Sequence, residues 1–112
     1  LMFRRALSNL LSNALRHSKD HSDVTIDISE TAQAIVVTVE NTGEDIDPQS
    51  IPRLFDRFYR ADPSRSHPQS DGAGLGLSIT RAIAQAHGGR VTVESGSGRT
   101  KFSLEFPSRL IL

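Results

Sequence analysis

A one-sided apolar repeat at the beginning of the chain constrains the fold more than any other feature. From Phe3 to Leu15 the apolar residues recur in steps of three and four, which is the period of a helix that buries one face. The repeat predicts a helix that ends near His17 and packs its apolar stripe against a second layer. Because no capping residue stands before Leu1, we expect the sequence to be cut from a longer protein.

Alternating apolar residues predict that second layer. The segments VTIDI (24–28) and IVVTVE (35–40) have the period of half-buried strands, and we expect them to be antiparallel neighbours. Near the end of the chain, RVTVE (90–94) and TKFSLEF (100–106) flank a Gly-Ser-Gly turn at 96–98. Two alternating segments joined by such a turn predict a hairpin.

A second amphipathic helix is predicted between the two pairs of strands. Its apolar residues recur at helical spacing: Leu75, Ile79, Ala82, Ile83 and Ala86. The glycines at 88–89 are expected to end it, and Asp47-Pro48 predicts a short helix through Leu54. Residues 56–74 are rich in charges and serines and have no sustained period. Irregular segments of that length in compact domains are mostly lids or binding loops.

These elements and the composition define the fold class. Strands covered on one face by two long helices make a two-layer α/β sandwich of the α+β type. A chain of 112 residues, 37% of them hydrophobic, suits one compact domain spanning 1–112. Thirteen basic and thirteen acidic residues cancel, which argues against a general nucleic-acid or anionic-membrane binder. The absence of cysteine excludes disulfides, thiolate metal sites and cysteine nucleophiles. No apolar run reaches the ~20 residues of a membrane-spanning helix, so we expect this fragment to be soluble.

A glycine-rich stretch, DGAGLGLSI (71–79), stands directly before the second helix. Gly72, Gly74 and Gly76 leave backbone N–H groups accessible where the helix dipole adds partial positive charge, so the stretch could bind a phosphate. The spacing alone is equally compatible with a flexible loop. It is neither a Rossmann fingerprint, which needs glycine at Leu77, nor a P-loop, which needs Gly-Lys-Ser/Thr.

Two asparagines share one face of the first helix. Asn9 and Asn13 are four residues apart, and Arg16 follows three residues later. Asparagine is a middling helix former, so a pair on one stripe suggests that polar oxygens are needed there. An amide oxygen can join the hard oxygen ligands of a Mg²⁺ that arrives with phosphates. The alternative, two exposed asparagines without a function, stays open for this helix taken alone.

Four blocks together resemble a known family. NLLSNALRHS (9–18), VENTGEDI (39–46), LFDRFYRADPSR (54–65) and DGAGLGLSI (71–79) are similar, in order and spacing, to the N, G1, F and G2 boxes of the sensor histidine kinase ATP-binding domain. The resemblance covers nearly the whole chain and is strongest to the membrane-bound heavy-metal (copper/silver) sensor kinases. It implies the Bergerat, or GHKL ATPase, fold, with a mixed, mostly antiparallel sheet and a long ATP lid at about 56–74.

The resemblance also implies how the phosphate end of such a site is built. Asn13 is the expected Mg²⁺ ligand, Asn9 lies beside it and Arg16 reaches the phosphates, and these three form the expected catalytic group. Lid residues Arg60 and Arg65 are expected to supply positive charge to the phosphates. The expected triphosphate contacts are Gly72, Gly74 and Gly76 with the N–H groups of Leu75 and Leu77.

At the other end, the resemblance assigns residues to the sugar and the base. His17 is expected near the sugar, Ile46 and Gly43 beside the base, and Thr100 at the floor of the adenine pocket. Asn41 matches the position that accepts a hydrogen bond from the adenine amino group, which is usually an aspartate. An uncharged acceptor predicts nucleotide affinity weaker by ~1 kcal/mol. Asp45 replaces the second glycine of the G1 box.

The family contains both kinases and hydrolases. The chaperone, mismatch-repair and topoisomerase ATPases carry a glutamate, the general base, four residues before the asparagine; here that residue is Asn9, whose amide cannot take a proton at neutral pH. The resemblance therefore implies transfer of the γ-phosphoryl of Mg-ATP to a histidine on a separate dimerisation domain, which this chain lacks, so the fragment alone is not expected to autophosphorylate. A GHKL hydrolase and a degenerate docking module without nucleotide remain alternatives.

The expected context is a two-component system. The partners are ATP, the dimerisation domain of the same kinase and, through the full-length protein, a response regulator, with no nucleic acid. This domain is expected in the cytoplasm and the parent protein in the bacterial inner membrane. Other residues have simpler readings: Phe55, Phe58 and Tyr59 as contacts to the core, His21, His67 and His87 as surface or capping residues, and Asp71 as a helix cap.

Overall fold

The computed structural model describes residues 2–59 and 75–108. Their helices and strands follow in the order α1 (Phe3–His17), β1 (Val24–Glu30), β2 (Ala34–Thr42), η1 (Ile51–Arg53), α2 (Gly76–Ala86), β3 (Arg90–Gly96) and β4 (Arg99–Pro107). Both long helices and both pairs of strands are therefore confirmed. The short helix predicted from Asp47 is reduced to the single 3-10 turn η1.

Local hydrogen bonds explain why that short helix starts late. The Asp47 carbonyl accepts a bond from the Ser50 N–H at 2.8 Å, and the Asp47 side chain accepts one from the Gln49 N–H at 2.9 Å. An aspartate that binds the backbone two residues on forms a turn that competes with helix. Pro52, inside η1, has no N–H to donate to a longer helix.

The sheet has the strand order β1-β2-β4-β3, and each neighbouring pair is antiparallel. The resemblance implied a mixed sheet, whereas the part of the chain that the structure describes contains antiparallel pairs alone. The two hairpins explain the β1–β2 and β3–β4 pairs, because short connections between consecutive strands reverse their direction. Between β3 and β4 the reversal uses Ser97 (φ 55°) and Gly98 (φ 78°), two residues with positive φ as a type I′ turn requires.

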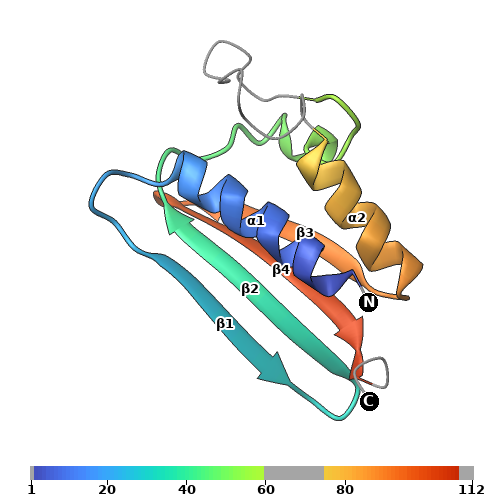
Figure 1. The fold of residues 1–112 in the computed structure, drawn as a ribbon. Coiled ribbons are helices and arrows are strands. Elements are labelled where there is room, and N and C mark those ends of the chain that lie inside the picture. Colours follow the sequence, from blue (N-terminus) through green and yellow to red (C-terminus); the bar gives the residue numbers. More distant parts are fainter. Residues whose placement is uncertain (1, 60–74, 109–112) are drawn as a thin grey trace.

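The two helices cover one face of the sheet, which makes the expected two-layer sandwich (Figure 1). Alternate residues of β2 and β4 point into the interface, including Val37, Val39, Phe102 and Leu104, each 1% exposed or less. From α1, Leu10 is fully buried, and burial of a leucine stabilises a fold by about 1.5–3 kcal/mol. The same alternation continues past the apolar core, so it carries polar residues of β2 and β4 onto the covered face.

None of the helices in the described residues is long and apolar enough to cross a membrane.

Candidate functional site

Four segments meet at one end of the sandwich. They are the C-terminal half of α1, the end of β2 with the loop after it, the start of α2, and the β3–β4 turn with the start of β4 (Figure 1). Backbone bonds join them: Lys19 N–H to the Thr42 carbonyl at 2.7 Å, and Gly43 N–H to the Gly98 carbonyl at 2.9 Å. These segments carry the predicted site residues that the structure describes: Asn9, Asn13, Arg16, His17, Asn41, Gly43, Ile46, Leu75, Gly76, Leu77 and Thr100.

Gly43 lies where two backbones come into contact. A Cβ at this position would be 2.4 Å from the carbonyl oxygen of His17, at the end of α1. The glycines with positive φ in the described residues are Gly88 and Gly98, so Gly43 is not needed for an unusual backbone conformation. It is needed because any side chain would separate α1 from the loop that follows β2.

Asn13 is a buried polar residue on α1, with 8% of its surface exposed. Its side-chain oxygen accepts a hydrogen bond from Nη2 of Arg16 at 3.3 Å, one helical turn later. The predicted pair of metal ligand and phosphate-binding cation is therefore in direct contact. A carbonyl oxygen has two lone pairs, so this bond leaves capacity for a second partner such as a metal ion. The alternative prediction, that Asn13 is an exposed residue, is therefore wrong in its exposure.

Asn9 lies one turn earlier and connects the two helices. Its amide Nδ2 donates to the carbonyl of Gly76 at 3.2 Å, and Oγ1 of the fully buried Thr80 donates to the same oxygen at 2.9 Å. Asn9 thus fixes the position of the first residue of α2 relative to α1. An aspartate or glutamate at this position, acting as a base, could not donate that bond.

The start of α2 has backbone N–H groups without a partner inside the helix. The first intrahelical bond runs from Ile79 N–H to the Leu75 carbonyl, so the N–H groups of Gly76, Leu77 and Ser78 precede it. No side chain caps this terminus, and no acidic residue lies in its first turn. The helix dipole and these donors make the terminus suitable for an anion. The side chain of Leu77 packs against the core.

Asn41 and Thr100 lie opposite each other on β2 and β4, on the covered face of the sheet. Both are nearly buried, with 4% and 6% of their surface exposed. The Asn41 amide forms no hydrogen bond with any other residue of 2–59 or 75–108. No side-chain nitrogen or oxygen of the described residues is both fully buried and without a partner, so the polar atoms of Asn41 keep some contact with solvent and are accessible to a ligand.

Thr100 belongs to a short polar chain that sequence reasoning missed. Its hydroxyl is 2.8 Å from the hydroxyl of Ser95 on β3, and Ser95 Oγ also accepts the N–H of Ile46 at 2.8 Å. The chain connects the floor position Thr100 to the predicted apolar wall Ile46. Ser95 and Ile46 are 49 residues apart, so no local pattern in the sequence indicates the contact.

A hydrogen bond made by Asp45 explains why the loop does not need a glycine at this position. The carboxylate oxygen Oδ1 accepts the N–H of Gly98 at 2.8 Å, across 53 residues. Asp45 is not one of the described residues with positive φ, which are His21, Phe58 and Ser97 besides the glycines. The backbone at 45 therefore tolerates a side chain, and that side chain binds the β3–β4 turn.

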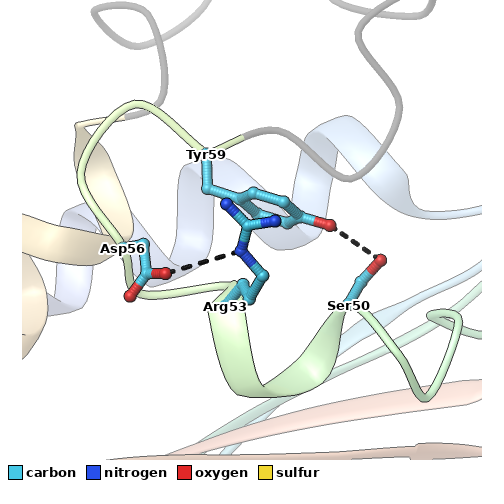
Figure 2. Close-up of polar contacts among 4 residues, drawn as sticks. All are labelled: Ser50, Arg53, Asp56 and Tyr59. Carbon is cyan, nitrogen blue, oxygen red and sulfur yellow. Dashed lines mark hydrogen bonds and ion pairs between the residues drawn. The ribbon is translucent and has the colours of Figure 1, made fainter.

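The three aromatic residues that follow η1 were predicted to contact the core, but they differ in burial. Phe55 and Tyr59 pack against the core, whereas Phe58 is 57% exposed, so the prediction is wrong for Phe58. Figure 2 shows how Tyr59 is held: its hydroxyl donates to Ser50 Oγ at 3.0 Å, and the Arg53 guanidinium lies 4.8 Å from its ring centre. Arg53 in turn pairs with Asp56 at 3.7 Å.

Arg57 contacts the exposed Phe58, with its guanidinium carbon 5.0 Å from the ring centre. His87 is the C-terminal cap residue of α2, and its Nδ1 is 2.8 Å from the Ile83 carbonyl, which confirms a capping role. His21 is exposed. The predicted site residues Arg60, Arg65, Gly72 and Gly74, and the simpler assignments of His67 and Asp71, lie outside the described residues.

Two further observations concern metal ligands and cavities. In residues 2–59 and 75–108 no group of three or more His, Asp or Glu is arranged to hold a metal ion. A metal there would depend on the Asn13 oxygen, on ligand oxygens and on water, which is how Mg²⁺ commonly binds. An open hollow of about 460 Å³ lies at the other end of the sheet, between the start of β2 and the end of β4, and the predicted site residues that are described do not line it.

Comparison with known proteins gives a family match. Residues 1–110 match the family described as "Histidine kinase-, DNA gyrase B-, and HSP90-like ATPase". The sensor histidine kinase CusS of Escherichia coli O157:H7 is 47% identical over 109 residues, which cover 97% of this chain and 22% of that protein. The chain thus spans about a fifth of the length of the curated relatives it matches.

Solved structures share the fold. The mycobacterial sensor histidine kinase MprB has a TM-score of 0.80 at 28% identity, covering 92% of this chain and 70% of that one. Full-length ShkA in complex with AMPPNP has a TM-score of 0.76 at 30% identity, covering 94% of this chain and 21% of that one. The similarity therefore includes almost all of the sandwich described above.

Proposed function

This chain belongs to the histidine kinase-, DNA gyrase B- and HSP90-like ATPase family, and we propose that it is the ATP-binding catalytic domain of a two-component sensor histidine kinase. The observation that carries the kinase assignment is the bond from the Asn9 amide to the Gly76 carbonyl. At the position where the hydrolases of the family have their general base, this chain has a hydrogen-bond donor that holds two helices together. Water activation therefore lacks its base, and phosphoryl transfer to a nucleophilic side chain does not need one.

The phosphate end of the proposed site lies between α1 and the start of α2. Asn13 and Arg16, already in contact, would face the phosphates, with the Asn13 oxygen as the protein ligand of a Mg²⁺. The uncapped N–H groups at Leu77 and its neighbours would bind phosphate oxygens. Arg60, Arg65, Gly72 and Gly74 complete this proposal from the sequence alone.

The base end lies at the covered edge of β2 and β4. The Asn41 amide, for which residues 2–59 and 75–108 supply no hydrogen-bond partner, suits an adenine, because its oxygen can accept from the exocyclic amine. Thr100 would lie beneath the base, Ile46 beside it, and His17 near the sugar. Gly43 allows the loop to approach α1 closely enough to join the two ends into one site.

Catalysis in this arrangement is mostly positioning and charge neutralisation. A neutral imidazole nitrogen is itself a nucleophile, so it would attack the γ-phosphorus while the bond to the bridging oxygen breaks and ADP leaves. Arg16 and the α2 amides would stabilise the charge on the transferring group. A Mg²⁺ bound with the nucleotide would neutralise part of the phosphate charge.

We also propose the wider context of this domain from its resemblance to sensor histidine kinases. The acceptor histidine would lie on a dimerisation domain outside this sequence, and the phosphoryl group would pass on to a response regulator. Similarity to the sensor histidine kinase CusS supports a role in signal sensing. A heavy-metal signal, a parent protein in the bacterial inner membrane and a cytoplasmic place for this domain belong to the same proposal and come from the resemblance of the sequence blocks.

Mixing experiments test the assignment. The chain is incubated with γ-labelled Mg-ATP and a separately produced dimerisation domain of the parent kinase. We expect acid-labile label on the acceptor domain, and none on an acceptor whose histidine is replaced. Release of free phosphate without label transfer would instead indicate a hydrolase, and absence of ATP binding would indicate a docking module.

A further inference from the structure

The loop of residues 43–46 is bound to the β3–β4 hairpin by three separate hydrogen bonds. Gly43 N–H donates to the Gly98 carbonyl at 2.9 Å, Gly98 N–H donates to the Asp45 carboxylate at 2.8 Å, and Ile46 N–H donates to Ser95 Oγ at 2.8 Å. The first bond is purely backbone and does not depend on residue type. The other two require Asp45 and Ser95, so these side chains determine whether the loop is fixed along its length.

Ser95 has a second role because its hydroxyl also contacts Thr100. Ser95 Oγ already accepts from Ile46, so the arrangement that uses most groups has Ser95 donating its proton to Thr100 Oγ1 at 2.8 Å. The Thr100 proton is then free to point away from Ser95. Thr100 lies directly across from Asn41, whose nearly buried amide has no partner among the described residues.

We propose that Ser95, assisted by Asp45, is the positioning residue for the nucleotide base. The Ser95 hydroxyl holds Ile46 in place and orients Thr100 as a donor toward a ring nitrogen of the base, while Asp45 fixes the outer side of the same loop. The inference rests on the proposed nucleotide function and deepens it. It also explains why this chain accepts an aspartate at a G1 glycine, since the carboxylate adds a contact to the turn.

Ser95→Ala separates base positioning from phosphate binding. Binding of ATP and of inorganic tripolyphosphate, each with Mg²⁺, is measured by calorimetry. Loss of the hydroxyl removes an acceptor and a donor, so we expect ATP to bind about five- to tenfold more weakly. Tripolyphosphate, which has no base, is expected to bind as it does to the parent chain. Ser95→Thr keeps the hydroxyl and is expected to retain ATP affinity within about twofold.

Two variants separate the contribution of the Asp45 hydrogen bond from that of its charge. Asp45→Ala is expected to weaken ATP binding about two- to threefold and to speed hydrogen exchange of the Gly98 amide, a modest effect because the contact is exposed. Asp45→Asn keeps an acceptor oxygen and is expected to preserve both. The matched controls are Asp27→Asn and Ser29→Ala, two exposed positions of β1.

The results distinguish failure of the proposed nucleotide function from failure of the positioning role of Ser95. A parent chain that binds no ATP contradicts the proposed function and this inference with it. A parent that binds ATP, with Ser95→Ala equally tight, contradicts the inference alone. Equal losses for ATP and tripolyphosphate in Ser95→Ala would also overturn it, because they would indicate general loss of structure instead of a misplaced base contact.

Discussion

The two ends of the proposed site are built differently. At the base end, Asn41 and Thr100 face each other across a strand register, and the 43–46 loop is hydrogen-bonded to the neighbouring hairpin. At the phosphate end, Asn13 contacts Arg16 of its own helix, and Asn9 makes one bond to α2. The base-end contacts cross between separate strands and loops, so they stabilise the fold as well as the proposed site. At the phosphate end Asn9 joins the two helices, whereas the Asn13–Arg16 bond stays within one helix, so substitution of Asn13 should affect binding more than stability.

The largest effect is expected for Asn13→Ala at the phosphate end. Removing the one side-chain oxygen proposed to bind Mg²⁺ should weaken Mg-ATP binding roughly 100-fold, or ~3 kcal/mol, while ATP binding in EDTA changes little. The melting temperature should stay close to that of the parent, because the Asn13 side-chain bond found in residues 2–59 and 75–108 is to Arg16 of its own helix. Calorimetry with and without Mg²⁺ measures the first effect and thermal unfolding the second. Equal Mg-ATP binding by parent and variant would remove the metal role.

Gly43→Ala should instead lower the stability of the chain, whether or not nucleotide is present. The added Cβ would be 2.4 Å from the His17 carbonyl oxygen, so backbone must move, at a cost of about 2 kcal/mol. The melting temperature should fall by roughly 10 °C even without nucleotide. Gly96→Ala is the control, because a Cβ there has no atom within 4 Å and should leave the melting temperature unchanged. Similar melting of both variants would argue against the close approach.

Thr100→Val should reduce stability and binding together. The substitution keeps the shape and removes the hydroxyl that pairs with Ser95, so unfolding free energy and ATP binding should each decrease by ~1 kcal/mol. Chemical denaturation and calorimetry measure the two quantities. Thr92→Val, at an exposed position of β3, should change neither. Weaker ATP binding with an unchanged free energy of unfolding would mean that the Thr100 hydroxyl contacts the ligand without stabilising the fold.

The smallest expected effect is a gain. Asn41→Asp introduces the more usual charged acceptor and should tighten ATP binding by ~1 kcal/mol, about fivefold. Because the position is 4% exposed, the same change should lower the unfolding free energy of the nucleotide-free chain. Gln33→Glu makes the same chemical change at an exposed position at the far end of the sheet and should do neither. Unchanged affinity in Asn41→Asp would mean that this side chain does not meet the base.

The features that were predicted correctly from the sequence are those that local periodicity determines. The bounds of α1, the strand pairs and the turn at 96–98 follow from spacing within a few residues, and the structure confirms them. Helical spacing also brought Asn9, Asn13 and Arg16 together correctly. Phe58 was misassigned because a pattern of aromatic residues does not reveal that one of them has positive φ and points outward.

Contacts between distant segments were beyond such patterns. Asn9 meets Gly76 across 67 residues, and Asp45 meets Gly98 across 53. The sequence indicated that Asp45 departs from the family glycine, but the carbonyl and amide groups that receive a side chain appear only once the hairpin and the loop are side by side. The polar chain through Ser95 was missed for the same reason, since a serine hydroxyl near a turn commonly bonds to the local backbone and does not indicate a distant partner.

An NMR titration of the labelled chain with Mg-ATP tests most directly whether both ends form one nucleotide site. Concerted amide shifts are expected at Asn41, Gly43, Ile46 and Thr100 together with Asn13, Arg16 and Leu77. Shifts confined to the hollow near Thr31 and Pro107, or no shifts at saturating nucleotide, would contradict it.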